Sequence, residues 1–166
     1  FIDQVTHALT ALVAQLQAAN VVSVEMEQPQ GGHFIGGKLA GSIDMLVVKD
    51  SGEEAVIDIK WGGYKYRQAG MKKDDYLQLA TYAKLRMDTA KKWRARAFFF
   101  ITDAKLLTFD THYFSEGNEV VTDSGESVAA YWQRIEQTWK WRRAQMDSGK
   151  IEVTITQTEP DEHSQP

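Results

Sequence analysis

The chain has 166 residues, of which 43% are hydrophobic and 25% are charged, and its formal net charge is −4. This length and composition suit one globular domain with a sizeable core, and a negative total is not what a simple DNA-binding module carries. The absence of cysteine excludes a disulfide framework and zinc sites built on thiolates. No apolar run approaches the length that spans a membrane.

Apolar spacing in the first half of the chain predicts one helix followed by three strands. The helix covers 3–19, with apolar residues at helical spacing: Leu9, Leu12, Val13 and Leu16. The strands lie near 21–28, 39–48 and 55–61. Residues 62–70 are bounded by glycines and rich in aromatic and basic side chains, so they predict a loop that either clamps a nucleic-acid strand or only connects.

The second half predicts two further helices around a pair of strands. These elements are a helix at 75–90, strands at 95–102 and 105–114, and a helix over 127–146 capped near Asp123 or Ser124. The tryptophans of the last helix are expected to pack rather than to stack on bases: Trp132, Trp139 and Trp141. Residues 1–155 therefore predict one domain, and the acidic, proline-containing segment 156–166 predicts a disordered tail.

Two carboxylates and one lysine interrupt the second and third predicted strands. Asp44 lies in the apolar run 41–48, and Asp58 and Lys60 lie in the run 55–61, with a polar turn at 49–54 between them. Side chains two apart share a strand face, so Asp58 and Lys60 point the same way, and an antiparallel neighbour can bring Asp44 across from Asp58. Ionised groups on apolar strands are rare unless they are paired or bind a metal.

The chemistry of this group favours phosphodiester hydrolysis. Paired carboxylates suit Mg²⁺ or Mn²⁺, which prefer oxygen ligands and keep waters for a substrate phosphate. A bound cation lowers the pKa of the attacking water, and an adjacent lysine can hold that water or offset phosphoryl charge. Gln78 and Tyr82, four residues apart on the predicted helix 75–90, project from one helix face, and Arg86 continues that face.

Asp44, the strand end Asp58-x-Lys60, and Gln78-x-x-x-Tyr82, in this order, resemble motifs II and III and the QxxxY motif of PD-(D/E)XK nucleases. The RecB/AddB-type branch is the most similar, and the resemblance runs from about residue 25 to residue 85. It implies an α/β fold with a restriction-endonuclease-like αβββαβ core, in which helices flank a mixed central sheet. The lack of cysteine implies a member without the four-cysteine iron–sulfur cluster that some relatives carry.

The resemblance also implies roles for individual residues. Asp44, Asp58 and the backbone carbonyl of Ile59 would bind the metal, Lys60 would be the catalytic lysine, and Gln78 and Tyr82 would contact DNA or orient catalytic groups. This branch places a histidine ligand on its first helix. His7 is in a position for that role, and the alternative is a partly buried helix histidine.

Other charged residues leave alternatives open. Glu25 and Glu27 share one face of a strand, and the solvent-facing interpretation is preferred over an approach to the metal. Basic residues form three clusters, of which the first, directly after Lys60, is expected to follow phosphates and the other two to be solvated. The clusters are Lys65, Arg67, Lys72 and Lys73; Lys91, Lys92, Arg94 and Arg96; and Lys140, Arg142 and Arg143.

The function that follows is a Mg²⁺- or Mn²⁺-dependent deoxyribonuclease in DNA repair, recombination or phage defence. Exonuclease action is favoured over site-specific endonuclease action by the QxxxY likeness. The domain is expected to be excised from a larger cytoplasmic protein, with DNA and a helicase-like region as partners and no membrane. The alternative is a catalytically silent nuclease-fold module that binds DNA or a partner protein.

Overall fold

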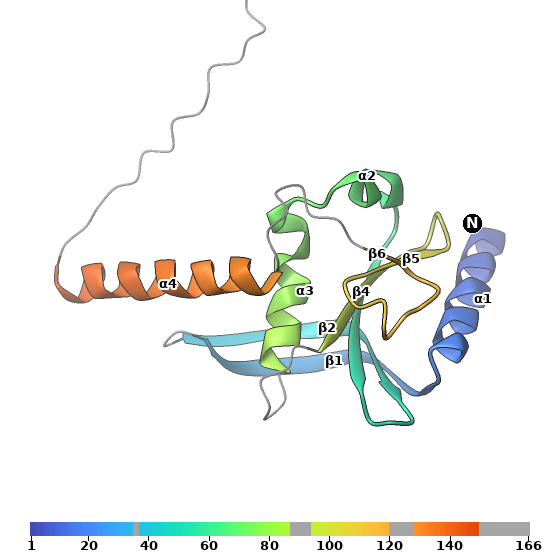
Figure 1. The fold of residues 1–166 in the computed structure, drawn as a ribbon, viewed down its shortest axis with the longest axis horizontal. Coiled ribbons are helices and arrows are strands. Elements are labelled where there is room, and N and C mark those ends of the chain that lie inside the picture. The colour runs from blue at the N-terminus through green and yellow to red at the C-terminus, as the bar shows by residue number, and fades with distance from the viewer. Residues whose placement is uncertain (35–36, 87–93, 120–127, 150–166) are drawn as a thin grey trace, which may run out of the picture.

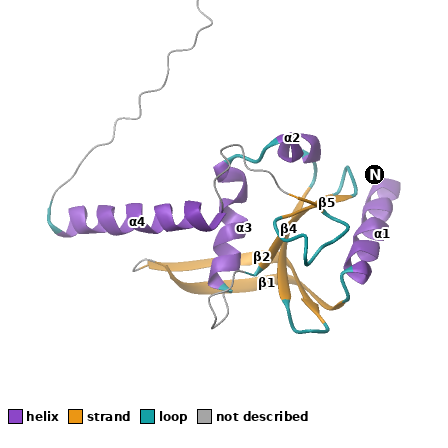
Figure 2. Ribbon diagram, viewed as in Figure 1, coloured by secondary structure: helices purple, strands orange, loops and turns teal. Residues whose placement is uncertain are grey.

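A computed structural model describes residues 1–34, 37–86, 94–119 and 128–149 of the chain. The predicted helices and strands occur in the predicted order, with a helix α2 and a strand β6 in addition (Figures 1 and 2). The helices are α1 (Ile2–Ala18), α2 (Tyr64–Ala69), α3 (Lys73–Leu85) and α4 (Val128–Asp147). The strands are β1 (Val21–Phe34), β2 (Gly37–Lys49), β3 (Glu54–Lys60), β4 (Ala95–Phe100), β5 (Lys105–Thr108) and β6 (Asn118–Glu119).

The strands form one mixed sheet in the order β1-β2-β3-β4-β5-β6. β1, β2 and β3 are antiparallel neighbours, β3 and β4 are parallel, β4 and β5 are antiparallel, and β5 and β6 are parallel. A parallel pair needs a crossover connection, and the chain between β3 and β4 contains α2 and α3. The α/β class with a mixed sheet and flanking helices is therefore confirmed.

Helices cover both faces of the sheet and give two separate apolar cores. On one face α1 packs against the β-strands through Ala8, Leu12 and Leu16. On the other face, α2, α3 and α4 contribute buried residues that pack with apolar strand residues: Tyr64, Leu79, Ala80 and Trp132. Alternate residues of β3 supply the two cores, Val56 to the α3 side and Ile57 to the α1 side.

The β1–β2 hairpin is much longer than the rest of the sheet requires. Its pairing runs from Val21 with Lys49 to Phe34 with Gly37, whereas β3 pairs only with residues 45–48 of β2. The remaining part, 28–34 and 37–43, extends beyond the residues that pair with β3 and is called the hairpin arm here (Figure 1). α3 packs closely against this arm: the Leu85 side chain lies so near Gly32 that a Cβ added there would be 2.7 Å from it.

Several expectations about the elements are wrong. Residues 62–70, expected as a loop, contain the helix α2. The strand expected over 105–114 ends at Thr108, where Asp110 accepts backbone hydrogen bonds from Tyr113 and Phe114 and so turns the chain. The cap expected near residues 123–124 and the tail 156–166 lie outside the described residues.

The apolar faces of two helices also differ from expectation. α1 buries the stripe Ala8, Leu12 and Leu16, while Leu9 and Val13, one position further round the helix, are exposed. In α4, Trp132 is buried as expected, but Trp139 is 54% exposed and Trp141 is 46% exposed. The second half of α4 extends past the sheet beside the hairpin arm, so it has no core to enter (Figure 1). Within the described ranges, none of the helices is long and apolar enough to cross a membrane.

Candidate active site

The site lies where β2 and β3 separate. Their backbone pairing runs from Val48 with Glu54 to Met45 with Ile57 and ends one pair before Asp44 would face Asp58. Beyond that point the Asp44 side chain replaces a backbone carbonyl as hydrogen-bond acceptor: its Oδ2 accepts a hydrogen bond from the Ile59 N–H at 2.9 Å. A carboxylate therefore bridges the opening between the two strands.

β2 also changes its orientation at Asp44. Ile43 packs in the core on the α3 face and Met45 in the core on the α1 face, although residues two apart in a regular strand share a face. Across the hairpin, Met26 pairs with Met45 and Gln28 with Ile43. Glu27 between them has a left-handed φ of 53°. The register is the same on both sides, so the backbone at Asp44 turns to a new orientation without an inserted residue.

Asp58 and Lys60 lie on the face of β3 that α2 and α3 cover, as strand alternation predicts. Lys60 Nζ is 2.8 Å from Asp58 Oδ2. Asp58 is only 5% exposed, and the other buried polar residue among those described is Thr108. Burial raises the pKa of the Asp58 carboxyl, and the nearby Asp44 charge adds to that rise, while Lys60 and Arg67 oppose it. The ion pair with Lys60 therefore stabilises the Asp58 carboxylate and opposes the free-energy cost of removing it from water.

Gln78 and Tyr82 lie together on α3, as their spacing predicts. Gln78 Nε2 is 3.4 Å from the Tyr82 hydroxyl. The Tyr82 ring lies against Gly41 of β2, where an added Cβ would stand 2.6 Å from the hydroxyl oxygen. Gly41 precedes Asp44 by three residues, which is about 10 Å along a strand. The helix that carries both residues therefore docks on the strand that carries Asp44.

The far end of α3 is fixed by ion pairs. Arg86 Nη2 and Nε lie 2.6 Å and 3.0 Å from the two carboxylate oxygens of Glu54, and Arg86 Nη1 is 3.3 Å from Gln30 Oε1. Arg94 Nε also lies 3.2 Å from Glu54. A bidentate pair of this kind is geometrically specific. It joins the end of α3 to the start of β3 and to the hairpin arm, so Arg86 is a structural link.

Arg67 is a further candidate for a functional role, and the sequence alone shows it only as one member of a basic cluster. It lies on α2, with Nη1 3.4 Å from the Gly62 carbonyl oxygen and its guanidinium over the Phe100 ring, 5.8 Å from the centroid. Gly63 has φ 95°, and a Cβ there would collide with the guanidinium. The two glycines thus allow Arg67 to fold back toward the end of β3, where its charge reaches Asp58. The Gly-Gly turn directly after Lys60 is the signal in the sequence.

The remaining candidates do not gather at this point. His7 is exposed on α1, which covers the opposite face of the sheet, although Phe1 stacks on Trp61 beside the end of β3 at 5.5 Å. In the part of the chain that the structure describes, no three His, Cys, Asp or Glu side chains form a metal-binding group. Glu25 and Glu27 are exposed, in agreement with the solvent-facing interpretation.

The donor set suits a hard divalent cation. Asp44 and Asp58 offer carboxylate oxygens close enough for their charges to interact, and the Ile59 carbonyl lies between Asp58 and Lys60 in the chain. Carboxylate and carbonyl oxygens are ligands of Mg²⁺ and Mn²⁺. Comparison of the chain with protein-family models gave no match, and comparison with curated proteins gave none either.

Proposed function

We propose that this chain is a Mg²⁺- or Mn²⁺-dependent DNA nuclease of the PD-(D/E)XK type, similar to the RecB/AddB-like branch. The observation that carries the proposal is the group of Asp44, Asp58 and Lys60 at the point where β2 and β3 separate. The order α1, β1–β3, α3, β4 supports it, because it follows the αβββαβ order that the motifs imply.

Asp44, Asp58 and the Ile59 carbonyl would hold the metal. A divalent cation bound there lowers the pKa of a water molecule and polarises the scissile phosphate. Metal binding needs the ionised form of Asp58, and Lys60 at 2.8 Å favours that form. Asp44 uses Oδ2 to fix the backbone at Ile59, which orients the strand end that presents Asp58 and Lys60.

Lys60 and Arg67 supply the positive charge for the reaction. Lys60 would hold the attacking water or offset the charge that develops on the phosphoryl oxygens, as fixed cations do in phosphoryl transfer. Arg67, which is held over the Gly62-Gly63 turn, would contact the same phosphate. Gln78 and Tyr82 would contact the DNA beside the scissile bond, from the helix that docks on β2 at Gly41.

Cleavage of linear and closed-circular DNA, with Mg²⁺, Mn²⁺ or EDTA, tests the proposal. We expect metal-dependent degradation by the wild type and a loss of about 10²–10⁴-fold in Lys60→Ala, since Lys60 takes part in proton transfer or charge stabilisation. Lys49→Ala is the matched control, because Lys49 ends β2 at the edge of the sheet opposite to the end of β3 that carries Lys60. Equal activity in the wild type and Lys60→Ala would refute the assignment.

The form of the products separates the modes of action. Loss of linear DNA alone supports an exonuclease, which would suit repair, recombination or phage defence beside a helicase-like region. Nicking of closed circles supports an endonuclease. Binding of DNA without any metal-dependent cleavage by the wild type would instead support a catalytically silent nuclease-fold module.

A further inference from the structure

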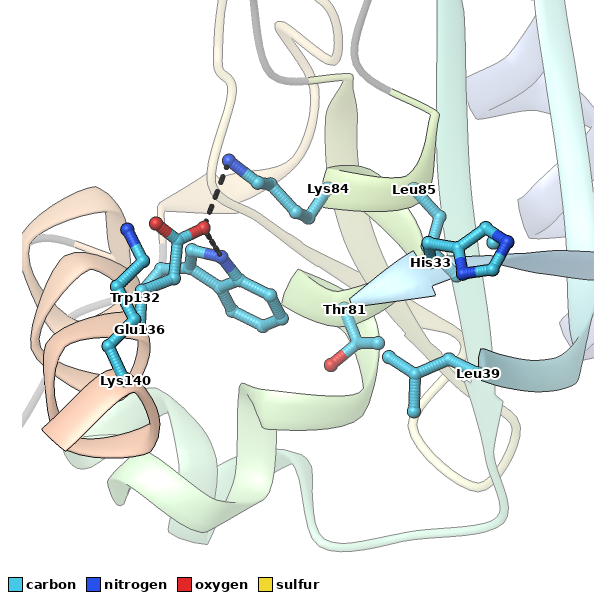
Figure 3. Close-up of a pocket in the computed structure, with 9 residues that line it drawn as sticks. His33, Leu39, Thr81, Lys84, Leu85, Trp132, Glu136 and Lys140 are labelled. Atoms are coloured by element: carbon cyan, nitrogen blue, oxygen red, sulfur yellow. Dashed lines mark hydrogen bonds and ion pairs between the residues drawn. The ribbon is translucent and has the colours of Figure 1, made fainter. Parts of the chain in front are cut away.

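A cleft opens between the hairpin arm, α3 and α4, away from the catalytic residues (Figure 3). It has a volume of about 400 Å³ and is lined by residues of all three elements. The lining side chains are His33 and Leu39 from the arm, Thr81, Lys84 and Leu85 from α3, and Trp132, Glu136 and Lys140 from α4. Apolar groups, two lysines and one glutamate thus line one concave surface.

The cleft leads toward the catalytic residues. A second hollow of about 380 Å³ shares Leu39, Thr81 and Leu85 with it and is also lined by Gln78 and Tyr82. Leu39 precedes Asp44 by five residues on β2, which corresponds to about 17 Å of strand. A stacked nucleic-acid strand advances about 3.4 Å per nucleotide, so the cleft lies about five nucleotides from the metal-binding carboxylates, or fewer for an extended strand.

The charges in the cleft favour an anionic occupant. Glu136, the acidic residue of the lining, already accepts the Trp132 indole N–H at 3.0 Å and lies 3.4 Å from Lys84 Nζ. Lys140 is exposed on the same face of α4, four residues after Glu136, and His33 lies across the cleft on the arm. Positive groups with local counter-charges of this kind follow a phosphate backbone.

Two exposed tryptophans lie next to Lys140 along α4, outside the lining of the cleft itself. Trp139 and Trp141 flank Lys140 in the segment 139–143, which continues with Arg142 and Arg143, and both indoles are about half exposed. Proteins that bind single strands combine aromatic stacking with a positive groove. A volume near 400 Å³ accepts a ligand of about the size of a small molecule, which fits one or two nucleotides and not a duplex.

We infer that the cleft between the hairpin arm and α4 binds a single-stranded segment of the substrate, several nucleotides from the scissile phosphate. This inference rests on the proposed nuclease function and assigns the nucleic-acid strand its path: past Gln78 and Tyr82, over Leu39, and between the arm and α4. Phosphates meet Lys140, and bases meet the apolar groups of the arm and α3.

A pair of opposite charges at one position tests the inference. Leu39→Glu and Leu39→Lys remove the same apolar contact and add side chains of similar length. Binding of a labelled oligothymidylate of about 10 nucleotides, long enough to span both sites, is measured in EDTA so that no cleavage intervenes. We expect Leu39→Glu to weaken binding at least tenfold relative to Leu39→Lys. Equal weakening by both variants would refute the inference and would indicate an apolar partner such as a peptide.

A second substitution keeps the test independent of folding at Leu39. Lys140→Glu lies on an exposed helix surface, and it should weaken binding and reduce the slope of log affinity against log salt by about 0.7 for one lost contact with a single strand. Lys49→Glu is its control, because Lys49 lies ten residues from Leu39 along β2. An unchanged salt slope in Lys140→Glu would overturn the assignment of the cleft.

The failure of the cleft and the failure of the nuclease are distinguishable. Bis(p-nitrophenyl) phosphate is too small to reach from the carboxylates to the cleft, so its hydrolysis reports on the catalytic site alone. Normal hydrolysis of this diester by Leu39→Glu together with slower cleavage of the oligonucleotide supports the cleft. Equal rates for both Leu39 variants on both substrates would overturn the assignment of the cleft. If the wild type hydrolyses neither substrate, the nuclease proposal is refuted, and the binding test in EDTA alone decides on the cleft.

Discussion

Replacement of Asp44 by alanine or by asparagine separates its effect on stability from its effect on catalysis. Alanine removes the acceptor for the Ile59 N–H, which lies in a partly buried position at 2.9 Å. A hydrogen bond to a charged group contributes about 1.5–3 kcal/mol, and an unsatisfied donor costs a similar amount. Loss of the Asp44 charge also relieves its repulsion with Asp58, so the net cost should be nearer to about 2 kcal/mol.

Asparagine should behave differently because it keeps an oxygen acceptor at the same place. Its bond to the Ile59 N–H becomes neutral and contributes about 0.5–1.5 kcal/mol, so Asp44→Asn should cost about 1 kcal/mol or less. For a chain of this size, about 1 kcal/mol corresponds to about 2–4 °C in Tm. We therefore expect Tm to fall by about 4–8 °C in Asp44→Ala and by less than about 4 °C in Asp44→Asn.

Both variants should nevertheless lose metal-dependent cleavage, because neither offers a carboxylate. Thermal and denaturant unfolding in EDTA measures the stability, and titration with Mg²⁺ measures the stabilisation by metal. Asp50→Ala, on an exposed turn, is the control for loss of an acidic residue. If Asp44→Asn is as unstable as Asp44→Ala, the bond to Ile59 is not what holds the strand end; if either variant cleaves DNA normally, Asp44 is not a metal ligand.

Three further predictions concern the surroundings of the carboxylates. Gly41→Ala should displace the Tyr82 ring, which should lower both stability and, about tenfold, the rate of cleavage. Adding Tyr82→Phe to this variant should restore part of the lost stability, because it removes the hydroxyl oxygen that lies 2.6 Å from the new Cβ. Additive losses of stability in a double-mutant cycle would contradict this contact. The pKa of Asp58 is raised above 3.8 by burial, so its contribution to stability is present below that pH and is lost as pH rises through the pKa of the folded state. Denaturant unfolding in EDTA should then show Asp58→Asn gaining stability relative to wild type from pH 4 toward neutrality, and a gap that closes instead would contradict the burial argument. Arg67→Ala should lower kcat about a hundredfold and shift the pH dependence of metal binding to higher pH, because Arg67 lowers the pKa of Asp58. Arg67→Lys keeps the positive charge and should leave that pH dependence unchanged. If Arg67 were purely structural, neither variant would shift the pH dependence of metal binding.

The parts of the site that follow from short-range periodicity could be predicted from the sequence. Alternation along β3 placed Asp58 and Lys60 on one face, and they form an ion pair. Helical spacing placed Gln78 beside Tyr82. The polar turn at 49–54 indicated that β2 and β3 are antiparallel neighbours. Each of these rules depends on residues a few positions apart, and each applies before any tertiary contact forms.

The features that depend on tertiary packing could not be predicted in this way. The hairpin arm packs closely against α3 at Gly32 and Gly41, and the strand pattern does not indicate this contact. The change of orientation of β2 at Asp44 lies opposite a left-handed Glu27 in the neighbouring strand, and glutamate has no intrinsic preference for that conformation. The tryptophans of α4 were expected to pack because large aromatic residues usually do, but Trp139 lies beyond the end of the core.

Three unfavourable features of the fold lie on adjoining strands at the candidate site, while left-handed residues also occur elsewhere, at Asn20 and Ala104. The open ladder at Asp44, the left-handed Glu27 and the buried Asp58 lie within adjoining strands, and each costs stability. Two apolar cores, one on each face of the sheet, offset that cost without contributing to the site. A fold selected for stability alone would close the ladder and replace Asp58 with an apolar residue. Together these features hold two carboxylates near each other in a partly desolvated position, which is the arrangement that the proposed phosphodiester-cleaving metal site needs.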